Sequence, residues 1–493
     1  MLTKTLILSD STVNDLPASI KTPVYDRTMV TPGILHIGLG NFHRAHQAWY
    51  LHRLMQQDLA LDWGIVGAGV RAGDETQRQK LAEQDYLTTL VELDPNGCSC
   101  EVVGSMVDFV PVEASNAALI AQMADPTIRI VSLTVTEGGY YIDPVSNSFD
   151  GSHPDMQHDA AQPQRPITAF GAMIAALAIR RTHGAGPFTC QSCDNLQGNG
   201  AILRQTLVSL ANLSDPDLAA WIDSNCTFPN SMVDCIVPAT GPNELELVRN
   251  FGIEDAAPVT HENFRQWVIE DNFCNGRPDW DKVGATFTDD VHAYEAMKIR
   301  ILNGGHRLIA DAGEILSLDF ISQCMAHPLI GAYFNKVAKS EIAFHVEAVP
   351  GMSPATYVEL VGRRFSNTEI IDTVRRVAFD GSSRQTGFIL PTMRDALASD
   401  TVMQGLALSQ ALWARMCQGV REDGTTIEPN DPHWKKLNSA AIASKANPED
   451  WLNQTDIYGD LADQPLFRER FKYWHAKIDA NGVEAALQSY IEG

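Results

Sequence analysis

The sequence lacks any apolar run near the roughly 20 residues that a membrane-spanning helix needs. Its N-terminal region holds only the short apolar stretch Leu6-Ile7-Leu8, too small for the apolar core of a secretory signal peptide. We therefore expect neither a membrane protein nor a secreted one, and we predict a cytoplasmic location.

No disulfide framework is expected either, because the nine cysteines are an odd number scattered from Cys98 to Cys417. Cys190 and Cys193 form a C-x-x-C motif, but no second pair follows at the spacing of a zinc site. We interpret these two cysteines as residues that pack a strand, and we expect no metal ion.

Basic residues are scarce relative to acidic ones: 37 lysines and arginines stand against 61 aspartates and glutamates, a formal net charge of -24. Such a surface repels nucleic-acid phosphates and anionic lipid headgroups, so neither is an expected partner. A small-molecule ligand, even an anionic one, stays compatible with this charge because a local pocket can be basic. The sequence also has no internal repeat.

The chain of 493 residues exceeds the size of a single hydrophobic core, so two domains are expected. In the first part, short apolar runs alternate with helical patterns, one of them from about Phe42 to Met55. This alternation is typical of parallel strands that are buried on both faces. The expected strands are Ile34–Ile37, Trp63–Val66 with a continuation to about Val70, Ile128–Thr136, Phe188–Cys190 and Met232–Val237.

Beyond about residue 290 the pattern becomes helical, with few candidate strands. The sequence thus predicts an α/β domain over residues 1–289 and a mostly α-helical domain over residues 290–493. The expected helical segments of the second domain include Tyr294–Leu302, Arg307–Leu316, Thr368–Ala378 and Asp395–Met416.

Gly38 and Gly40 form a G-x-G turn directly after the first expected strand and before a helix. Glycines there allow a tight turn and let backbone N–H groups approach a pyrophosphate at the start of the helix. His43 stands where the usual third glycine would be, so this motif alone indicates a dinucleotide site only weakly.

The ends of two further strands carry candidate cofactor ligands. Asp74 follows the second expected strand, where a carboxylate binds an adenosine ribose and repels a 2′-phosphate, although Arg71 nearby is able to pair with one. NAD is therefore favoured over NADP; the alternative is that Asp74 is a solvated loop residue. Thr136 and Glu137 close another apolar run where open α/β sheets bind ligands, and a plain turn is the alternative there.

The segment Lys298–His306 places an ammonium, an amide and an imidazole close together. On a helix of 3.6 residues per turn, Asn303 and His306 share a face, and Lys298 lies on an adjacent arc. Oxidation of an alcohol needs a base as the hydride leaves, and a partly desolvated lysine beside an oxidised nicotinamide has a lowered pKa. An amide such as Asn303, or Asn195 after an expected strand, would stabilise the alkoxide. The alternative is a set of ordinary solvated side chains.

Gly304 and Gly305 stand in the middle of this expected helix, where each costs roughly 1 kcal/mol relative to alanine. They predict either a close backbone approach or a helix end.

With these residues in place, the chain closely resembles the polyol-specific long-chain dehydrogenase family, which includes mannitol 2-dehydrogenase and fructuronate reductase. The resemblance covers nearly the whole length. It is carried by HIGLGNFHRAHQ at His36–Gln47, SLTVTEGGY at Ser132–Tyr140, SCDN at Ser192–Asn195, FRQWVIED at Phe264–Asp271, NGRP at Asn275–Pro278 and KIRILNGGH at Lys298–His306.

The resemblance implies a Rossmann-type N-terminal domain, a helical C-terminal domain and metal-independent chemistry with Lys298 as general acid and base. It further implies that Asn195 and Asn303 polarise the reacting oxygen and that Glu295 gates a water path to the lysine. Other substrate hydroxyls would be held by His306, Asp234, Arg376 and Arg384. The cofactor would be held by Gly38, Gly40, Asn41, Phe42, Arg44, Asp74, Thr136 and Glu137.

The chain departs from the family pattern at four positions. Gly305 replaces a usual serine, and Gly73 stands where an acidic residue can precede Asp74. Cys235 replaces a usual arginine and Arg384 a usual lysine; both positions lie near the expected substrate and leave its identity open.

We therefore expect an NAD-dependent dehydrogenase acting on mannitol or a related polyol such as arabinitol or sorbitol. The alternative is a hexuronate reductase that makes mannonate from fructuronate, with Arg376 or Arg384 holding the carboxylate. A catalytically idle dinucleotide sensor is disfavoured, because the candidate base and both amides are present. The oligomeric state stays open, with a monomer compatible.

Overall fold

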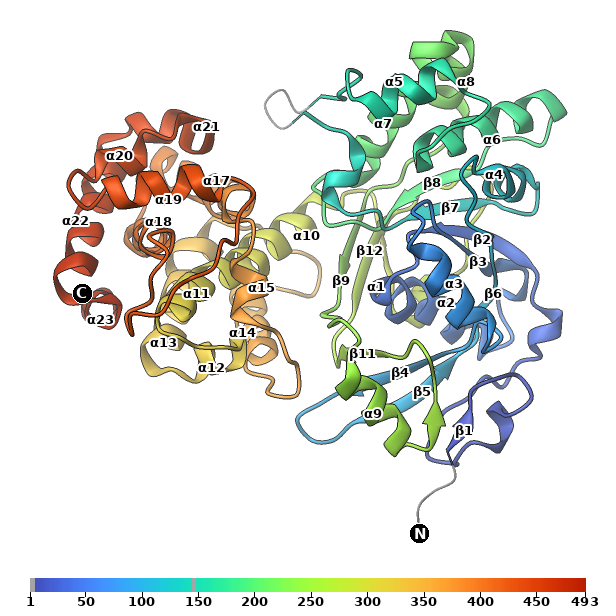
Figure 1. The fold of residues 1–493 in the computed structure, drawn as a ribbon, viewed down its shortest axis with the longest axis horizontal. Coiled ribbons are helices and arrows are strands. Elements are labelled where there is room, and N and C mark those ends of the chain that lie inside the picture. Colours follow the sequence, from blue (N-terminus) through green and yellow to red (C-terminus); the bar gives the residue numbers. More distant parts are fainter. Residues whose placement is uncertain (1–4, 144–147) are drawn as a thin grey trace. The chain divides into compact units, whose positions relative to one another are not determined.

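The computed structural model describes residues 5–143 and 148–493, apart from the side chain of Glu137. The chain divides into two compact units, Met1–His292 and Ala293–Gly493. All the strands of the described residues belong to the first unit (Figure 1).

A parallel five-stranded sheet forms the centre of the first unit, in the order β6-β3-β2-β7-β8. Chain order reverses between β2 and β7, and ligands of open α/β sheets bind in the crevice at such a point. The expected Rossmann-type fold is thereby confirmed. The strands are β6 (Met106–Phe109), β3 (Gly64–Ala68), β2 (Pro32–Ile37), β7 (Ile130–Leu133) and β8 (Thr189–Ser192).

The strands of this sheet are buried on both faces, as their apolar runs predict. In β2, Leu35 and Ile37 pack into one hydrophobic core and Ile34 into the other. Figure 1 shows the helices that cover the two faces. One face carries α4 (Ala117–Ala124), α6 (Ala169–His183) and α7 (Asn199–Ser214); the other carries α1 (Asn41–Ala45), α2 (Gln47–Met55) and α3 (Asp74–Ala82).

The interpretation of Met232–Val237 as another parallel strand was wrong. Strand β9 (Ser231–Asp234) pairs antiparallel with β12 (Gln266–Glu270) in a separate sheet. Shortly before β9, the chain does contact the main sheet: Cys190 N–H, in β8, donates a hydrogen bond to Thr227 O. Pro229 follows two residues later and has no N–H with which to continue that ladder. Burial on both faces gave no information about strand direction.

Smaller elements complete the first unit. A three-stranded sheet is formed by β11 (Val259–Glu262), β4 (Thr88–Leu93) and β5 (Ser99–Val103), and β13 (Thr286–Thr288) joins β12. The rest are β1 (Leu6–Ile7), β10 (Ile253–Glu254), α5 (Pro154–Ala161), α8 (Pro216–Asn225) and α9 (Pro242–Asn250).

The helix expected over Phe42–Met55 is two helices, because His46 between α1 and α2 has the non-helical dihedral angles φ -121 and ψ -95. The second expected strand also ends earlier than predicted, at Ala68, and Trp63 lies in a 3₁₀ turn before it.

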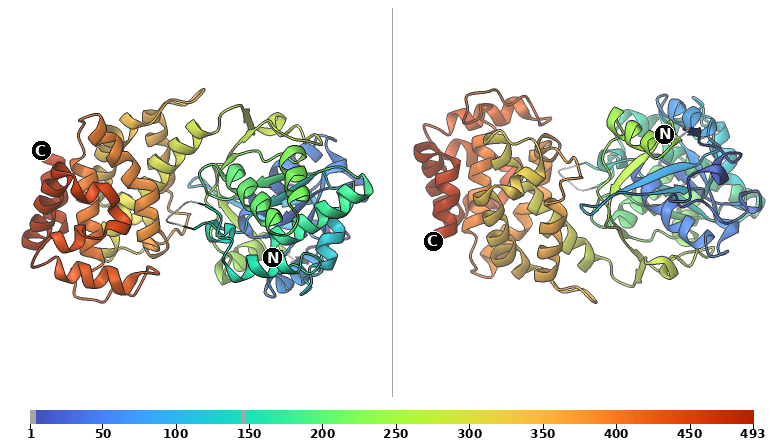
Figure 2. Two further views of the ribbon diagram at one scale, coloured as in Figure 1. Left: turned by 90° about the horizontal axis from the view of Figure 1, so that it is seen from above. Right: turned by 90° about the horizontal axis from the view of Figure 1, so that it is seen from below.

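The second unit is helical (Figure 2), as expected. Its central helix is α11 (Gly304–Ile315), which packs against α12, α13, α15 and α18. The others are α10 (His292–Met297), α12 (Ile321–Ala326), α13 (Pro328–Val337), α14 (Pro354–Phe365), α15 (Val374–Ala378), α16 (Gly381–Arg384), α17 (Leu390–Ala398), α18 (Gln404–Met416), α19 (Trp434–Ala443), α20 (Glu449–Leu452), α21 (Thr455–Tyr458), α22 (Pro465–Asn481) and α23 (Val483–Glu492).

Two expected helical segments were wrong in extent. Only Val374–Ala378 of the segment Thr368–Ala378 is helical, because the Thr373 side chain caps α15 by accepting a hydrogen bond from Arg376 N–H. The segment Asp395–Met416 is interrupted between α17 and α18, where Asp400 has a φ of 51. In the part of the chain that is described, no helix combines the length and apolarity needed to cross a bilayer.

Candidate active site

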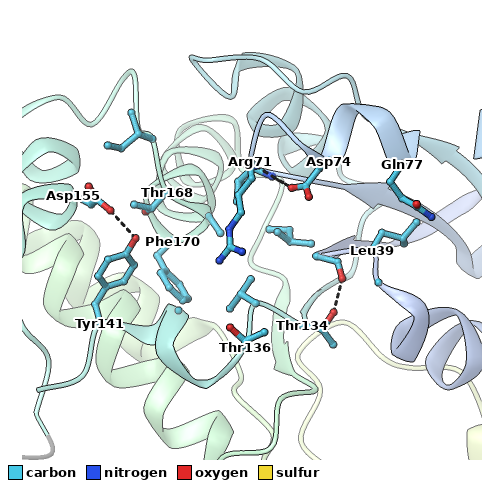
Figure 3. Close-up of a pocket in the computed structure, with 18 of the residues that line it drawn as sticks. Leu39, Arg71, Asp74, Gln77, Thr134, Thr136, Tyr141, Asp155, Thr168 and Phe170 are labelled. Carbon is cyan, nitrogen blue, oxygen red and sulfur yellow. Dashed lines mark hydrogen bonds between the residues drawn. The ribbon is translucent and has the colours of Figure 1, made fainter. Parts of the chain in front are cut away.

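A cavity of about 430 Å³ opens at the carboxyl ends of β2, β3 and β7, at the point where strand order reverses (Figure 3). It therefore lies where a Rossmann-type sheet binds its ligand. Its lining includes Gly38, Leu39, Gly40, Arg71, Asp74, Thr134, Thr136, Tyr141, Asp155 and Phe170.

The glycine turn forms one wall of this cavity. Gly38 has a φ of +91, and a Cβ there would lie 2.2 Å from Thr134 O, so no other residue fits. A Cβ on Gly40 would meet no protein atom within 4 Å, although Gly40 also lines the cavity. The open space at Gly40 is thus available to a ligand that approaches the backbone closely.

The sequence suggested that Asp74 lies in the loop after the second strand. In the structure it is the first residue of α3. Its Oδ2 accepts hydrogen bonds from the backbone N–H groups of Val70 and Arg71, both at 3.0 Å. A Cβ on Gly69 would lie 2.2 Å from the Asp74 Cβ, so this glycine makes room for the carboxylate. With Oδ2 bonded inward, Oδ1 is left to accept from a ligand. Figure 3 shows the Arg71 guanidinium extending into the same cavity.

A carboxylate that sequence reasoning did not single out braces the opposite wall. Asp194 accepts hydrogen bonds from Val135 N–H and Thr136 N–H, both at 3.0 Å, and from the Tyr140 hydroxyl at 2.7 Å. It thereby ties the loop after β7 to the loop after β8. Thr136 lines the cavity, whereas the side chain of Glu137 lies outside the described residues.

Three other expected cofactor residues are not among those that line the cavity. The Asn41 amide donates to Pro238 O and Thr240 Oγ1 and accepts from Arg44. Arg44 is only 2% exposed and also donates to Ala257 O, and burial lowers its pKa to about 10. Phe42 stacks on His46 with a centroid distance of 4.8 Å. These side chains hold α1 in place.

In the second unit, Lys298–Asn303 forms a π-helix, η6, between α10 and α11. The expected spacing of 3.6 residues per turn was therefore wrong for this segment. On an α-helix Lys298 and Asn303 would point about 140° apart. Hydrogen bonds from residue i to i+5 bring residues five apart close to the same face, and such π segments are frequent at functional sites.

Of the two glycines after η6, Gly305 makes a close approach, one of the two alternatives that the sequence left open, whereas Gly304 has only ordinary contacts. A Cβ on Gly305 would lie 2.7 Å from the Phe334 ring, and one on Gly304 would lie 3.4 Å from Phe388 O. Phe388 belongs to another π-helix, η9 (Gln385–Ile389), which packs against η6.

Three polar side chains lie near the start of α11. Lys298 is 6% exposed. Asn303 Oδ1 and His306 Nε2 are both buried, and neither has a hydrogen-bond partner within the described part of the chain. Because an unsatisfied buried polar atom costs about 1–3 kcal/mol, these two atoms indicate a site for a ligand with hydroxyl groups.

His306 is held neutral at this site. Its ring stacks on Phe365 with a centroid distance of 4.0 Å. Burial lowers the pKa of His306 well below its ordinary value, and the positive charges of Arg376, Arg364 and Arg384 lower it further. A neutral imidazole can both donate to and accept from sugar hydroxyls.

Asp372 is the main residue of this cluster that the sequence did not reveal. It is buried and binds Arg376 through both oxygens, each at 2.8 Å, and its Oδ2 lies 3.6 Å from His306 Nε2. Arg384 donates to the backbone oxygens of Arg376 and Val377. The spacing of four between Asp372 and Arg376 was visible, but nothing in the sequence placed the pair beside His306.

The remaining candidates lie on both units. Glu295 is buried on α10. In the first unit, Asp234 is the buried last residue of β9, and Asn195 is exposed three residues after β8 ends. Each unit thus carries part of the residue set expected for catalysis.

Comparison with known proteins matches both parts of the chain. Residues 32–282 match the mannitol dehydrogenase Rossmann domain, and residues 290–479 match the mannitol dehydrogenase C-terminal domain. Mannitol 2-dehydrogenase of Cereibacter sphaeroides is 54% identical over 473 residues, which cover 96% of this chain and 99% of that protein.

Two solved structures are similar over almost their full length. Mannitol 2-dehydrogenase of Pseudomonas fluorescens, in a ternary complex with NAD and D-mannitol, has a TM-score of 0.91 and 39% identity and covers 99% of this chain and 100% of its own. A substrate-free D-sorbitol dehydrogenase has a TM-score of 0.88 and 32% identity, and covers 98% and 100%.

Proposed function

The chain belongs to the mannitol dehydrogenase family, and from this premise we propose that it is an NAD-dependent polyol dehydrogenase that interconverts mannitol and its 2-ketose. The observation that carries this proposal is that Asn303 Oδ1 and His306 Nε2, on the same short stretch of chain as the buried Lys298, are buried and have no hydrogen-bond partner among the described residues. We further propose that residues 1–289 bind the dinucleotide and residues 290–493 the polyol.

The cavity of the first unit fits NAD. Gly40 leaves room for a pyrophosphate against the backbone, and Asp74 offers a carboxylate oxygen to a ribose hydroxyl. That carboxylate favours NAD over NADP because it would repel a 2′-phosphate. When bound, the nicotinamide supplies the hydride acceptor for alcohol oxidation.

The chain's own residues supply the acid–base part of the reaction. Lys298 takes the proton of the carbinol hydroxyl as the C–H bond breaks, and returns it in the reverse direction. The amides of Asn195 and Asn303 donate hydrogen bonds to the developing alkoxide. Glu295, three residues before Lys298, passes the proton on toward water.

The substrate cluster favours a neutral polyol over a sugar acid. Arg376 is 58% exposed at its side chain, but both oxygens of Asp372 neutralise its charge. A substrate carboxylate would compete with Asp372 for that guanidinium, whereas hydroxyl groups need only hydrogen bonds. We propose that His306, Arg376, Arg384 and Asp234 bind the hydroxyls away from the reacting carbon.

The nine cysteines, all within the described residues, form no disulfide bond. We propose a cytoplasmic location, because free thiols are typical of proteins from a reducing compartment.

A substrate panel tests the proposal. NAD and NADP are each combined with mannitol, arabinitol, sorbitol, mannonate and altronate while reduced nicotinamide is followed by absorbance. We expect the highest kcat/KM with mannitol and NAD. Activity confined to the sugar acids would instead establish the hexuronate reductase.

The variant Lys298→Ala tests the mechanism. We expect turnover to fall by roughly 10²-fold or more, because a general base contributes 10²–10⁴-fold, while NAD binding measured by calorimetry is retained. Unchanged turnover would remove Lys298 from the reaction, and an inactive wild-type protein that still binds NAD would identify a dinucleotide sensor.

A further inference from the structure

A chain of buried polar groups lies directly behind the glycine turn. On β2, His36 is fully buried between two hydroxyls of the neighbouring segment: its Nδ1 lies 2.7 Å from Ser132 Oγ and its Nε2 lies 2.9 Å from Thr134 Oγ1. The Thr134 hydroxyl donates to Gly38 O at 2.6 Å, and that carbonyl also accepts from Gly40 N–H at 2.8 Å.

These bonds fix the orientation of one peptide plane. In a trans peptide the carbonyl oxygen and the following N–H point in opposite directions. Because Gly38 O is held toward Thr134, the N–H of Leu39 points the other way. Leu39 lines the cavity, and its N–H has no hydrogen-bond partner among the described residues. This donor is therefore left for a ligand.

The number of available protons determines which group donates in each of these hydrogen bonds. Burial lowers the pKa of His36 to about 3, so the ring is neutral near pH 7 and carries one N–H. Thr134 spends its only hydroxyl proton on Gly38 O, so the ring N–H must be on Nε2 and donate to Thr134. Nδ1 then accepts from the Ser132 hydroxyl.

The same count assigns the amide next in the chain. Gln47 Oε1 lies 2.8 Å from Ser132 Oγ, but the Ser132 proton is already used by His36. A neutral His36 therefore requires the Gln47 amide to be turned so that its NH₂ group donates to Ser132. The Gln191 amide, whose Oε1 lies 3.2 Å from Gln47 Nε2, must then be turned with it so that its NH₂ group donates to Gln47. Each hydrogen bond from Gln47 to Gly38 then points the same way, and such aligned bonds strengthen one another.

His43 accounts for the missing third glycine of the turn. Its ring stacks on His36 with a centroid distance of 3.5 Å, and neither of its nitrogens has a hydrogen-bond partner in the part of the chain described. Both rings are buried, so His43 packs α1 against β2 through the imidazole plane of His36. A glycine there would leave that ring unsupported.

We propose that His36 is a positioning residue for the dinucleotide, acting through Thr134 on the Gly38–Leu39 peptide so that Leu39 N–H faces the pyrophosphate. This inference rests on the proposed NAD-dependent function. It assigns to the His36–Thr134 bond a contribution to diphosphate binding and none to the adenine or to the reacting alcohol.

The test compares Thr134→Val with Thr134→Ser in the full chain. Calorimetry measures the dissociation constants of NAD, of ADP-ribose, which keeps the diphosphate, and of adenosine, which lacks phosphate. We expect Thr134→Val to weaken the binding of NAD and ADP-ribose roughly tenfold or more, since the hydrogen bond from Leu39 N–H to the charged diphosphate is lost. Adenosine binding should stay unchanged, and Thr134→Ser should restore the affinity.

Thr89→Val is the matched control, because Thr89 is a fully buried strand threonine whose hydroxyl has no partner among the described residues. It should bind ADP-ribose as the wild type does. His36→Phe keeps an aromatic ring for His43 but removes both hydrogen bonds. Its effect should not add to that of Thr134→Val in the double variant, because both remove the same bond.

Steady-state kinetics gives a second readout. In Thr134→Val the KM for NAD should rise while kcat at saturating NAD stays within about twofold, since the bond is made equally in ground and transition states. Wild-type affinity of Thr134→Val and His36→Phe for ADP-ribose would overturn the inference and leave the proposed function intact. A wild-type protein that binds neither NAD nor ADP-ribose would overturn the proposed function itself.

Discussion

Asp372 sets the net charge of the Arg376 side chain, which donates to both of its oxygens. Burial raises the pKa of its carboxyl group, whereas Arg376 lowers it. In Asp372→Asn the charge of Arg376 is no longer neutralised, and the guanidinium loses the two-oxygen pairing that orients it toward the substrate hydroxyls. We expect the KM for mannitol to rise roughly tenfold.

The same variant should bind mannonate more tightly as an inhibitor, because Arg376 becomes available to a carboxylate. Asp456→Asn is the control, since Asp456 pairs with Lys436 at the surface. Tighter mannitol binding together with weaker mannonate binding in Asp372→Asn would contradict this role.

Single residues differed in how far the sequence revealed them. Gly38 was predictable because the tight turn after the first strand needs a positive φ, which residues other than glycine rarely adopt. Lys298 and His306 were proposed from the sequence because they lie close together in one segment and because of the family resemblance. Asp194 and Asp372 were not, because each acts through contacts between segments distant in the chain: Asp194 reaches Thr136, and Asp372 reaches His306.

At the scale of one helix, the two glycines at the start of α11 allow a test of how closely the backbone is packed beside the proposed catalytic residues. Gly305→Ala places a methyl group 2.7 Å from the Phe334 ring, and we expect a loss of roughly 1–3 kcal/mol in the free energy of unfolding. Gly304→Ala meets only ordinary contacts and should gain roughly 0.5–1 kcal/mol. Urea unfolding followed by circular dichroism compares the two, and equal midpoints would contradict the packing argument.

Element positions were predictable where burial and period decide them, as in β2, β7 and β8. The predictions failed where hydrogen bonding determines the type of helix or the direction of a strand. The π-helix η6 has the same apolar spacing as an α-helix over its six residues, and only the i to i+5 bonding distinguishes them. The direction of β9 depended on its partner β12, more than thirty residues later, which no local pattern encodes.

At the scale of the whole molecule, the alternation of strands and helices followed by helices alone was sufficient to predict the fold class, because layer architecture follows from element order. The strand order β6-β3-β2-β7-β8 was not predicted, because the pattern does not encode it and the resemblance implied only a Rossmann-type domain. Burial of neutral histidines is a further property of the whole fold that composition conceals.

Three such histidines, His36, His52 and His261, have a pKa lowered to about 3 by burial. Between that value and about 6.5 the unfolded chain binds a proton at each of these positions and the folded chain does not. Stability is therefore fully present above pH 6.5 and falls as the pH decreases through this window, by up to about 1.4 kcal/mol per pH unit for each histidine.

His52→Gln isolates one of these contributions, because glutamine retains an acceptor for the Tyr25 hydroxyl, which lies 2.8 Å from His52 Nδ1, and does not titrate. Urea midpoints measured from pH 7.5 to pH 4 should show a variant that is less stable at neutral pH but loses less stability with acid. The two curves should therefore converge as the pH falls. Parallel curves would mean that His52 is protonated in the folded protein as readily as in the unfolded chain, which its burial beneath Tyr25 and Gly104 argues against.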